Sequence, residues 1–362
     1  MKRSILVSIF ALSSVVANAG VLFMGAYPSS VMVVDDTTGK VVDRIHLETG
    51  LPTSLRMSFD KKLIYVATND HAGIEVIDVA TRKVLSHFVL NDATHLYRFG
   101  GGAADPQGKF LYGQTTEITK QIDRYEIGKP KYTIVDLATG KIAKTFDVPG
   151  NGNGGGGGGN RGGGFEVSPD GKYLYQFGAQ ITVLSTTDFS EVEKIELAQP
   201  DAPAMEGMGF GGMQETLSEP GQRVSIFNYS DPIVHNKVFG LAHFDLNTRK
   251  FDFTPLGPSP IAMTNLRVTP DKKMGYLVTT SGTLGNKRCE FMAVDLVTTR
   301  IAGTSELACR SRYSFGMSGN GKKLYIYGAG FEIEVFDAAT FKKEATWDLE
   351  NDMTGGGMIY VP

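Results

Sequence analysis

One phrase of apolar and polar residues recurs seven times along the chain. It consists of an apolar strand ending in Asp, a Thr three residues later, a basic residue and a second strand. The copies read VVDDTTGKVVDRIHL (33–47), VIDVATRKVLSHFVL (76–90), IVDLATGKIAKTFDV (134–148), the degenerate VLSTTDFSEVEKIEL (183–197), HFDLNTRKFDFTPL (243–256), AVDLVTTRIAGTSEL (293–307) and VFDAATFKKEATWDL (335–349). Successive anchor residues (Asp35, Asp78, Asp136, Ser185, Asp245, Asp295 and Asp337) lie 42 to 60 residues apart. This spacing is typical of one repeat fold rather than of separate domains.

Each copy predicts a β-hairpin. Its flanking segments alternate with period two and are rich in β-branched residues, and Asp at the turn entry accepts backbone N–H groups. A second hairpin precedes most copies and turns at Pro-Asp-Gly or a variant, as in VSPDGKYLYQFG (167–178). Four strands per repeat make one propeller blade. The sequence therefore predicts an all-β, seven-bladed β-propeller with four-stranded blades.

The two ends of the chain predict how the ring closes. The first copy follows the strand VLFMGAY (21–27) and lacks an innermost strand of its own. The chain ends with GGGMIYVP (355–362), which resembles GGGFEVSP (162–169), the innermost strand of a middle blade. We therefore expect the C-terminal strand to complete the first blade.

The N-terminal residues predict export. Lys2 and Arg3 precede an apolar run over 5–16, and the small-residue pattern of a signal-peptidase site follows at 17–19. The apolar run is too short to span a bilayer, and no apolar stretch of spanning length follows it. The sequence predicts a signal peptide over 1–19, a single propeller domain over 20–362, and a periplasmic or secreted location without a membrane span.

The charge balance excludes two classes of partner. The chain has 36 Lys and Arg residues against 39 Asp and Glu residues, and its net charge of −3 becomes −5 when Lys2 and Arg3 are removed. This balance provides neither a basic footprint for nucleic acid nor a polybasic patch for a membrane surface.

The cysteines and histidines limit the chemistry of the chain. Cys289 and Cys309 are the only two cysteines, and an oxidising compartment predicts that they form a disulfide. Cys289 begins one strand of the sixth blade and Cys309 follows the next strand, so the two should lie opposite each other. The six histidines lack the close spacing of metal ligands. We expect no metal and no cofactor on this chain, and no catalytic motif is evident.

Insertions predict which face of the disc carries the function. Turns that join strands one to two and three to four are short, whereas connections two to three and four to one are long in several blades. The long connections are 117–130, 149–164, 198–214, 228–240 and 280–288. Because loops on a rigid scaffold carry binding, we expect the partner surface on the face of these connections.

Two insertions have unusual compositions. Residues 154–159 are consecutive glycines that lead into a strand rather than a helix, so they are interpreted as a flexible loop over the channel mouth and not as a phosphate cradle. The segment MEGMGFGGM (205–213) is apolar and glycine-spaced. It suits either an adaptable protein contact or a plug in the channel.

Arginine, aromatic and methionine side chains at the starts of innermost strands and in these loops are the candidate contacts, because Arg and aromatic residues anchor buried interfaces. They are Arg98, Phe99, Arg161, Phe165, Met208, Phe210, Met213, Tyr229, Arg267, Arg312 and Tyr313. For each residue of the channel ring taken singly, a structural role is the favoured interpretation, and a partner contact is the alternative.

The repeats VIDVATRKV (76–84), IVDLATGKI (134–142) and SPDGKYLYQFG (168–178) resemble the YVTN-type propeller repeat. The charged insertion that ends RYEIGKPKYTIVDLATGK, the clipped blade AQITVLSTTDFSEV and the ending EIEVFDAATFKKEATWDL resemble the beta subunit of quinohemoprotein amine dehydrogenase. This resemblance implies a periplasmic propeller without a cofactor, whose partner subunits carry haem c and a tryptophylquinone. In agreement, the chain has no CxxCH motif, and its single Trp, Trp347, lies in a repeat strand.

Two functions are open at this point. The chain is either the non-catalytic propeller subunit of an amine dehydrogenase-like oxidoreductase, or a stand-alone secreted propeller that recognises a protein, glycan or envelope ligand. A third interpretation, a lactonase-like propeller enzyme, is disfavoured because no metal-binding constellation is evident.

Overall fold

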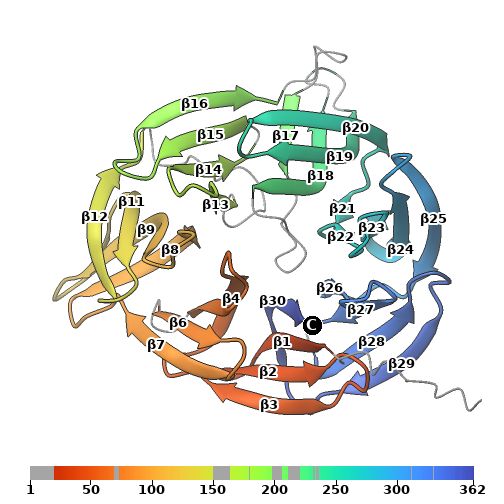
Figure 1. The fold of residues 1–362 in the computed structure, drawn as a ribbon, viewed down its shortest axis with the longest axis horizontal. Helices are drawn as coiled ribbons and strands as arrows, with labels where there is room; N and C mark the ends of the chain where they lie inside the picture. Colours follow the sequence, from red (N-terminus) through yellow and green to blue (C-terminus); the bar gives the residue numbers. More distant parts are fainter. Residues whose placement is uncertain are drawn as a thin grey trace, which may run out of the picture.

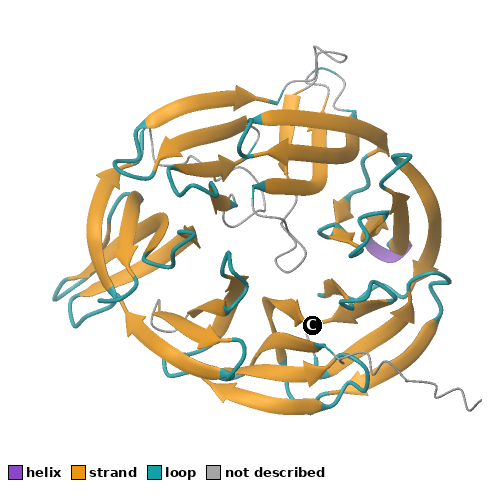
Figure 2. Cartoon of the chain, viewed as in Figure 1, coloured by secondary structure: helices purple, strands orange, loops and turns teal. Residues whose placement is uncertain are grey.

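The computed structural model describes residues 20–362 apart from 69–72, 150–163, 179, 198–205, 211–220, 231–232, 234–235, 311 and 329. Seven antiparallel sheets surround a central axis (Figure 1). Within the described residues, the one helical segment is the short 3-10 helix η1 (Leu284–Asn286), and strands form the rest of the regular structure (Figure 2). The predicted seven-bladed β-propeller is confirmed. The predicted signal peptide lies outside the described residues.

The first blade is built from both ends of the chain. From the axis outward its strands are β30 (Met353–Val361), β1 (Val21–Ala26), β2 (Ser30–Asp35) and β3 (Val41–His46). Strand β30 pairs antiparallel with β1, from Val21 opposite Val361 to Ala26 opposite Met353. Closure of the first blade by the C-terminal strand is therefore confirmed.

The other blades follow in chain order, and the strands of each run from the axis outward. Blade two contains β4 (Pro52–Met57), β5 (Leu63–Thr68), β6 (Gly73–Asp78) and β7 (Lys83–Val89). Blade three contains β8 (His95–Ala104), β9 (Phe110–Lys120), β11 (Lys131–Asp136) and β12 (Lys141–Asp147), with the extra strand β10 (Tyr125–Ile127) beside β9. Blade four contains β13 (Phe165–Val167), β14 (Tyr173–Phe177), β15 (Gln180–Ser185) and β16 (Glu191–Glu196).

The last three blades complete the ring. Blade five contains β17 (Glu206–Phe210), β18 (Gln222–Ser230), β19 (Lys237–Asp245) and β20 (Lys250–Pro258). Blade six has a divided inner strand, β21 (Ala262–Met263) and β22 (Arg267–Val268), then β23 (Met274–Ser281), β24 (Arg288–Asp295) and β25 (Arg300–Leu307). Blade seven contains β26 (Ser314–Met317), β27 (Lys323–Tyr327), β28 (Glu332–Asp337) and β29 (Lys343–Asp348).

Each blade buries both of its faces. On β1, Leu22 and Met24 belong to the core shared with blade seven, whereas Phe23 belongs to the core shared with blade two. The same alternation separates Met32 from Val33 on β2. In the described chain one such core lies between every pair of neighbouring blades. Strands that are buried on both faces read as continuous apolar runs, which explains sequences such as VMVV in β2.

Asp at the entry of the turn between strands three and four fixes the geometry of that turn. Asp35 accepts hydrogen bonds from the backbone N–H groups of Thr37 (3.0 Å) and Thr38 (2.7 Å) and from the Thr38 hydroxyl (2.8 Å). The fourth residue after the anchor has a positive φ in every blade; these residues are Gly39, Arg82, Gly140, Phe189, Arg249, Thr299 and Phe341. Glycine adopts this conformation without strain, which accounts for the Thr-Gly-Lys form of the repeat.

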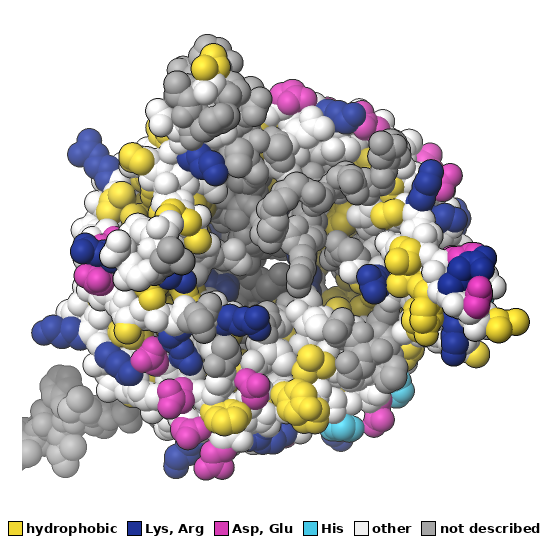
Figure 3. All heavy atoms as spheres, turned by 180° about the vertical axis from the view of Figure 1, so that it is seen from behind, with side chains coloured by type: hydrophobic (Ala, Val, Ile, Leu, Met, Phe, Trp, Pro, Cys, Tyr) yellow, Lys and Arg dark blue, Asp and Glu magenta, His cyan; other side chains and the backbone are white. Residues whose placement is uncertain are grey.

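The two faces of the disc differ in their connections. We define the turn face as the one with the connections from strand one to two and from three to four, such as 58–62 and 79–82. We define the loop face as the one with the connections from strand two to three and from four to the next blade, such as 27–29 and 121–130. Figure 3 shows the loop face, where hydrophobic side chains form separate groups around the ring.

Blade five departs from the predicted division. The expectation that turn-face connections are short in every blade is wrong here, because β17 ends at Phe210 and β18 begins at Gln222. In blade six the corresponding connection runs only from Val268 to Met274.

The prediction for the segment 205–213 is also wrong in part. Its residues Glu206–Phe210 form β17, the innermost strand of blade five, paired with β18, rather than a loop or a plug. Innermost strands lie close to one another around the axis, and β8 (HLYRFGGGAA) and β30 (MTGGGMIYV) are glycine-rich as well. Glycine spacing in this fold therefore marks an inner strand.

The turn face also bears a buried contact at the seam between blades seven and one. The Tyr325 hydroxyl on β27 donates a short hydrogen bond to the carboxylate of Asp36. Burial raises the pKa of Asp36, and burial together with the Asp36 charge raises the pKa of Tyr325. Blade four contacts blade five in the same way, because Tyr175 donates to the carbonyl of Leu246, the residue after the anchor Asp245, at 2.5 Å. The second-strand tyrosine thus links its own blade to the turn of the next.

The first prediction concerns closure. Deletion of 355–362 should abolish cooperative unfolding, because blade one loses its inner strand and β1 is left as an exposed, aggregation-prone edge. A circular permutant of the full mature sequence that joins Pro362 to Gly20 through a five-residue turn, with its new ends in another connection, should unfold as cooperatively as the parent, because Val361 already lies opposite Val21. Thermal unfolding followed by circular dichroism measures both. A truncated protein that melts like the full chain would contradict the argument.

The second prediction uses the adjacent carboxyls Asp35 and Asp36. Hydrogen bonds from Thr38 lower the pKa of Asp35, whereas burial raises the pKa of Asp36. As pH rises above 3.8, the ordinary pKa of an Asp side chain, ionisation of the buried Asp36 lowers the free energy of unfolding. The contribution of Asp35 is present above 3.8 and is lost as pH falls through its lowered pKa.

Relative to the parent, Asp36→Asn should therefore become more stable as pH rises above 3.8, and Asp35→Asn should become less stable as pH rises toward 3.8. Urea unfolding at a series of pH values gives the two slopes. Slopes of the same sign in the two variants would refute the assignment.

Candidate functional site

Two exposed aromatic side chains flank the seam between blades seven and one on the loop face. Tyr27, in the connection from β1 to β2, is 60% exposed, and Phe331, before β28, is 54% exposed. The backbone N–H of Tyr27 donates to the carbonyl of Asp352 at 2.9 Å, and the N–H of Leu349 donates to the carbonyl of Phe331 at 2.8 Å. The connection from β29 to β30 thus holds both aromatic loops. We call Tyr27, Phe331 and residues 349–352 the seam patch.

The seam patch is acidic and firmly supported. Glu350 and Asp352 are exposed, whereas Leu349 and Met353 at the ends of the connection are buried. The guanidinium of Arg44 donates to the carbonyl of Leu349 at 3.3 Å. Aromatic rings and carboxylates are therefore presented together on a fixed backbone. Such a surface fits a partner group that combines apolar area with cationic or hydroxyl groups.

The insertion of blade three forms a second projection on the loop face. Strand β9 continues beyond the blade and pairs with β8 on one edge and with β10 on the other, so that Ile118 lies opposite both Leu96 and Ile127. We call residues 121–130 the flap. Tyr125 in the flap is 58% exposed, and Ile127 is also exposed.

A histidine and two carboxylates join the base of the flap to β8. The Nδ1 atom of His95 lies 3.1 Å from both carboxylate oxygens of Asp92, and its Nε2 atom lies 3.6 Å from Oε1 of Glu117 on β9. Backbone N–H groups of Thr94 and His95 lower the pKa of Asp92. The described residues contain no cluster of three or more His, Cys, Asp or Glu side chains suited to a metal ion. The contact joins the start of β8 to β9 at the base of the flap.

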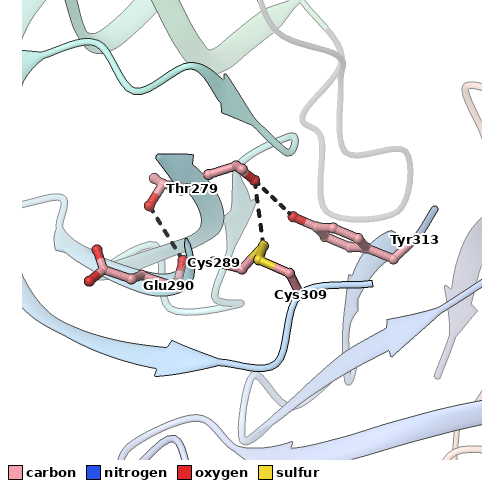
Figure 4. The surroundings of a disulfide bond; sticks show 6 residues. Thr279, Cys289, Glu290, Cys309 and Tyr313 are labelled. Carbon is pink, nitrogen blue, oxygen red and sulfur yellow. Dashed lines mark hydrogen bonds between the residues drawn. A yellow bond between two sulfur atoms is a disulfide. The ribbon is translucent and has the colours of Figure 1, made fainter. Parts of the chain in front are cut away.

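The disulfide anchors the connection between blades six and seven. Cys289 on β24 is bonded to Cys309, and their Cα atoms are 5.3 Å apart, which confirms the predicted pairing. The Thr280 hydroxyl lies 3.7 Å from Sγ of Cys289 and 3.4 Å from the hydroxyl of Tyr313 (Figure 4). Tyr313 is therefore held beside the disulfide and half-buried, whereas its neighbour Arg312 is exposed.

Arginines on two innermost strands bridge blades instead of presenting free donors. Arg56 on β4 donates to the carbonyl of Phe165 on β13 at 3.2 Å. Strand β8, which lies between β4 and β13 in the ring, has three consecutive glycines and so presents few side chains in the path of Arg56. Arg267 on β22 donates through Nε and Nη2 to the carbonyl of Phe315 on β26, at 3.1 and 3.0 Å. Arg267 thus links blade six to blade seven.

The candidate contacts predicted from the sequence do not come together in one place. Arg98 is exposed, and Phe99 packs against the core between blades two and three. Phe165 and Tyr229 are corrected to core residues, because they face neighbouring strands within the ring and not the loop face. Met208 and Phe210 lie in β17, and Arg161 and Met213 lie outside the described residues.

The seam patch was not predicted from the sequence. The pair Tyr27-Pro28 at a tight turn and Phe331 between Gly330 and Glu332 are the local signals. Neither aromatic residue stands in an insertion, so the lengths of the connections do not indicate it.

Comparison with known proteins supports the fold and gives no family. No family model matches the chain, and no curated protein matches it. A protein of unknown function from Desulfotomaculum acetoxidans is similar in structure, with a TM-score of 0.55 and 12% identity over 94% of this chain and 98% of that one. Dihydro-heme d1 dehydrogenase NirN in complex with DHE gives a TM-score of 0.50 and 14% identity over 94% of this chain and 74% of that one. The Dos1 propeller gives a TM-score of 0.50 and 13% identity over 82% of this chain and 71% of that one. At these identities the likeness shows the fold alone.

The third prediction concerns the disulfide. Replacing both Cys289 and Cys309 by Ala should lower the free energy of unfolding by on the order of 3 kcal/mol, because the 20-residue closure is lost from the unfolded chain. Thiol titration of the denatured, unreduced protein should find no free thiol. Thr280→Val is the matched control, since it removes the contact with Tyr313 and leaves the disulfide in place. Two titratable thiols, or a double variant as stable as the parent, would contradict the prediction.

Proposed function

We propose that this chain is an exported propeller that binds a protein partner through its loop face. The supporting observation is the distribution of exposed aromatic side chains. Among the described residues there are three, Tyr27, Tyr125 and Phe331, and all of them lie on the loop face. The large apolar residue exposed at the tip of a turn-face turn is Val297. Exposed apolar and aromatic groups on one face of a rigid scaffold are typical of an interaction surface.

The disulfide and the predicted signal peptide support an exported location. The bond between Cys289 and Cys309 favours an oxidising compartment, as does the predicted signal peptide. Within the described part of the chain, no helix is long and apolar enough to cross a membrane.

More specifically, we propose the non-catalytic propeller subunit of an amine dehydrogenase-like complex, with haem c and a tryptophylquinone on its partner subunits. The sequence resemblance over nearly the whole mature chain supports this assignment. In such a complex this chain contributes surface rather than chemistry. Its loop face then contacts the haem-bearing or quinone-bearing subunit.

The second candidate is a stand-alone secreted propeller that recognises a glycan or an envelope ligand. The observation that favours it is the composition of the seam patch. Tyr27 and Phe331 offer aromatic faces, and Glu350 and Asp352 offer hydrogen-bond acceptors for hydroxyl groups.

The fourth prediction tests the loop face. Tagged mature protein is used to capture partners from its own periplasmic or secreted fraction. Phe331→Ser should weaken capture at least tenfold, because burial of a Phe side chain contributes about 1.5–3 kcal/mol. Val297→Ser, which alters an exposed apolar residue on the turn face, is the matched control and should leave capture unchanged.

The outcome also separates the two candidates. Co-purified haem absorbance with amine-dependent dye reduction supports the subunit. Glycan binding that Phe331→Ser removes, without any haem protein, supports the stand-alone propeller. Binding that Val297→Ser reduces as strongly as Phe331→Ser would refute the assignment to the loop face.

A further inference from the structure

Strand β10 in the flap presents an open edge. The N–H of Gln121 donates to the carbonyl of Arg124, and the N–H of Gly128 donates to the carbonyl of Glu117, both at 2.8 Å. In an antiparallel ladder, alternate residues direct their backbone groups to the same neighbour. Arg124, Glu126 and Gly128 therefore bond toward β9, whereas the N–H and C=O groups of Tyr125 and Ile127 point away from it. In the described sheet no strand pairs with that outer edge.

The side chains around this edge are self-complementary. When two copies of β10 run antiparallel and Tyr125 lies opposite Tyr125 of the other copy, Arg124 of each copy lies opposite Glu126 of the other. Opposite charges placed across strands stabilise the pair, and so does the central aromatic pair. We propose that the outer edge of β10 binds the same edge of a second copy of this chain, forming a two-fold symmetric dimer.

Charge complementarity selects this register. Hydrogen bonding alone does not, because registers centred on Tyr125, Glu126 or Ile127 all direct the outward backbone groups of Tyr125 toward the second copy. A register centred on Ile127 places Tyr125 opposite Lys129, and one centred on Glu126 places Arg124 opposite Gly128, so that both lose the charge complementarity. The register centred on Tyr125 forms the pair of Arg124 and Glu126 twice, because a two-fold contact repeats every pair.

Charge and exposure make the edge available. Within one copy Arg124 contacts Glu126 at 2.9 Å, and both side chains are more than half exposed. Exchange of this partner for Glu126 of the second copy needs only side-chain rotation and leaves no charge unpaired. Ile122 at the tip of the flap is 107% exposed and therefore touches almost nothing in its own chain. The flap thus extends beyond the ring, which leaves space for a second propeller.

The size of the contact sets its strength. One short strand from each copy buries much less than the roughly 1,200 Å² of a stable interface. The dimer is therefore concentration-dependent, and it dissociates on dilution. Both surfaces lie on the loop face, but the dimer uses the flap and the partner capture is tested at Phe331 in the seam patch, so the two proposals can fail separately.

The fifth prediction tests the dimer by analytical ultracentrifugation of the mature protein over a range of concentrations. Arg124→Glu should lower the association constant at least tenfold, because it places Glu opposite Glu twice. The double variant Arg124→Glu/Glu126→Arg should restore association, because each pair regains opposite charges. Phe331→Ser should leave association unchanged, which distinguishes failure of this proposal from failure of the seam patch.

Cross-linking fixes the register. The native cysteines are both in the disulfide, so an introduced Cys is the only thiol. Tyr125→Cys should give a covalent dimer under mild oxidation, because residues directly opposite each other have Cα atoms about 5.5 Å apart. Ile127→Cys is the matched control and should give no covalent dimer, because residue 127 lies opposite Asp123 of the other copy. A protein that stays monomeric at every concentration, or equal cross-linking at 125 and 127, would overturn the proposal.

Discussion

Every blade of this protein has two apolar faces, and a single sheet cannot bury either face by itself. Leu22 and Phe23 are neighbours on β1, yet they belong to the cores on opposite sides of the blade. A linear row of such blades would expose an apolar face and a strand edge at each end. The pairing of β30 with β1 removes both ends at once. The remaining packing of the ring depends on this contact, because it brings blade seven against blade one.

Closure of the ring also explains why the two faces of the disc differ in their connections. On the turn face, Asp anchors and second-strand tyrosines join neighbouring blades, as in the contacts of Tyr325 with Asp36 and of Tyr175 with Leu246. The turns between strands three and four are constrained by the packing of two blades and vary little in length. On the loop face a connection can lengthen without loss of the ring, as the insertion of blade three does. The insertion of blade three and the seam patch both lie there.

The sequence predicted the elements that repeat and missed those that occur once. Seven anchors, the closing strand and the disulfide followed from repeated spacing and from the pairing of the only two cysteines. Strand β17 was missed because its glycines carry no period-two signal, although GGGM at the closing strand has the same composition. Strand β10 forms only because β9 continues beyond its blade. The exposure of Tyr27 and Phe331 depends on backbone hydrogen bonds with Asp352 and Leu349, which are distant in the chain, so no local pattern encodes it.

The two projections of the loop face are held in different ways, and this difference bears on what each can bind. The seam patch is fixed by backbone hydrogen bonds and by the burial of Leu349 and Met353. A surface that is already ordered loses little conformational entropy on binding, so it suits a specific and durable partner. The flap is held by β9 alone along a strand of three residues. Association through the outer edge of β10 must also order the long side chains of Arg124 and Glu126. This loss of side-chain entropy keeps the association weak and reversible.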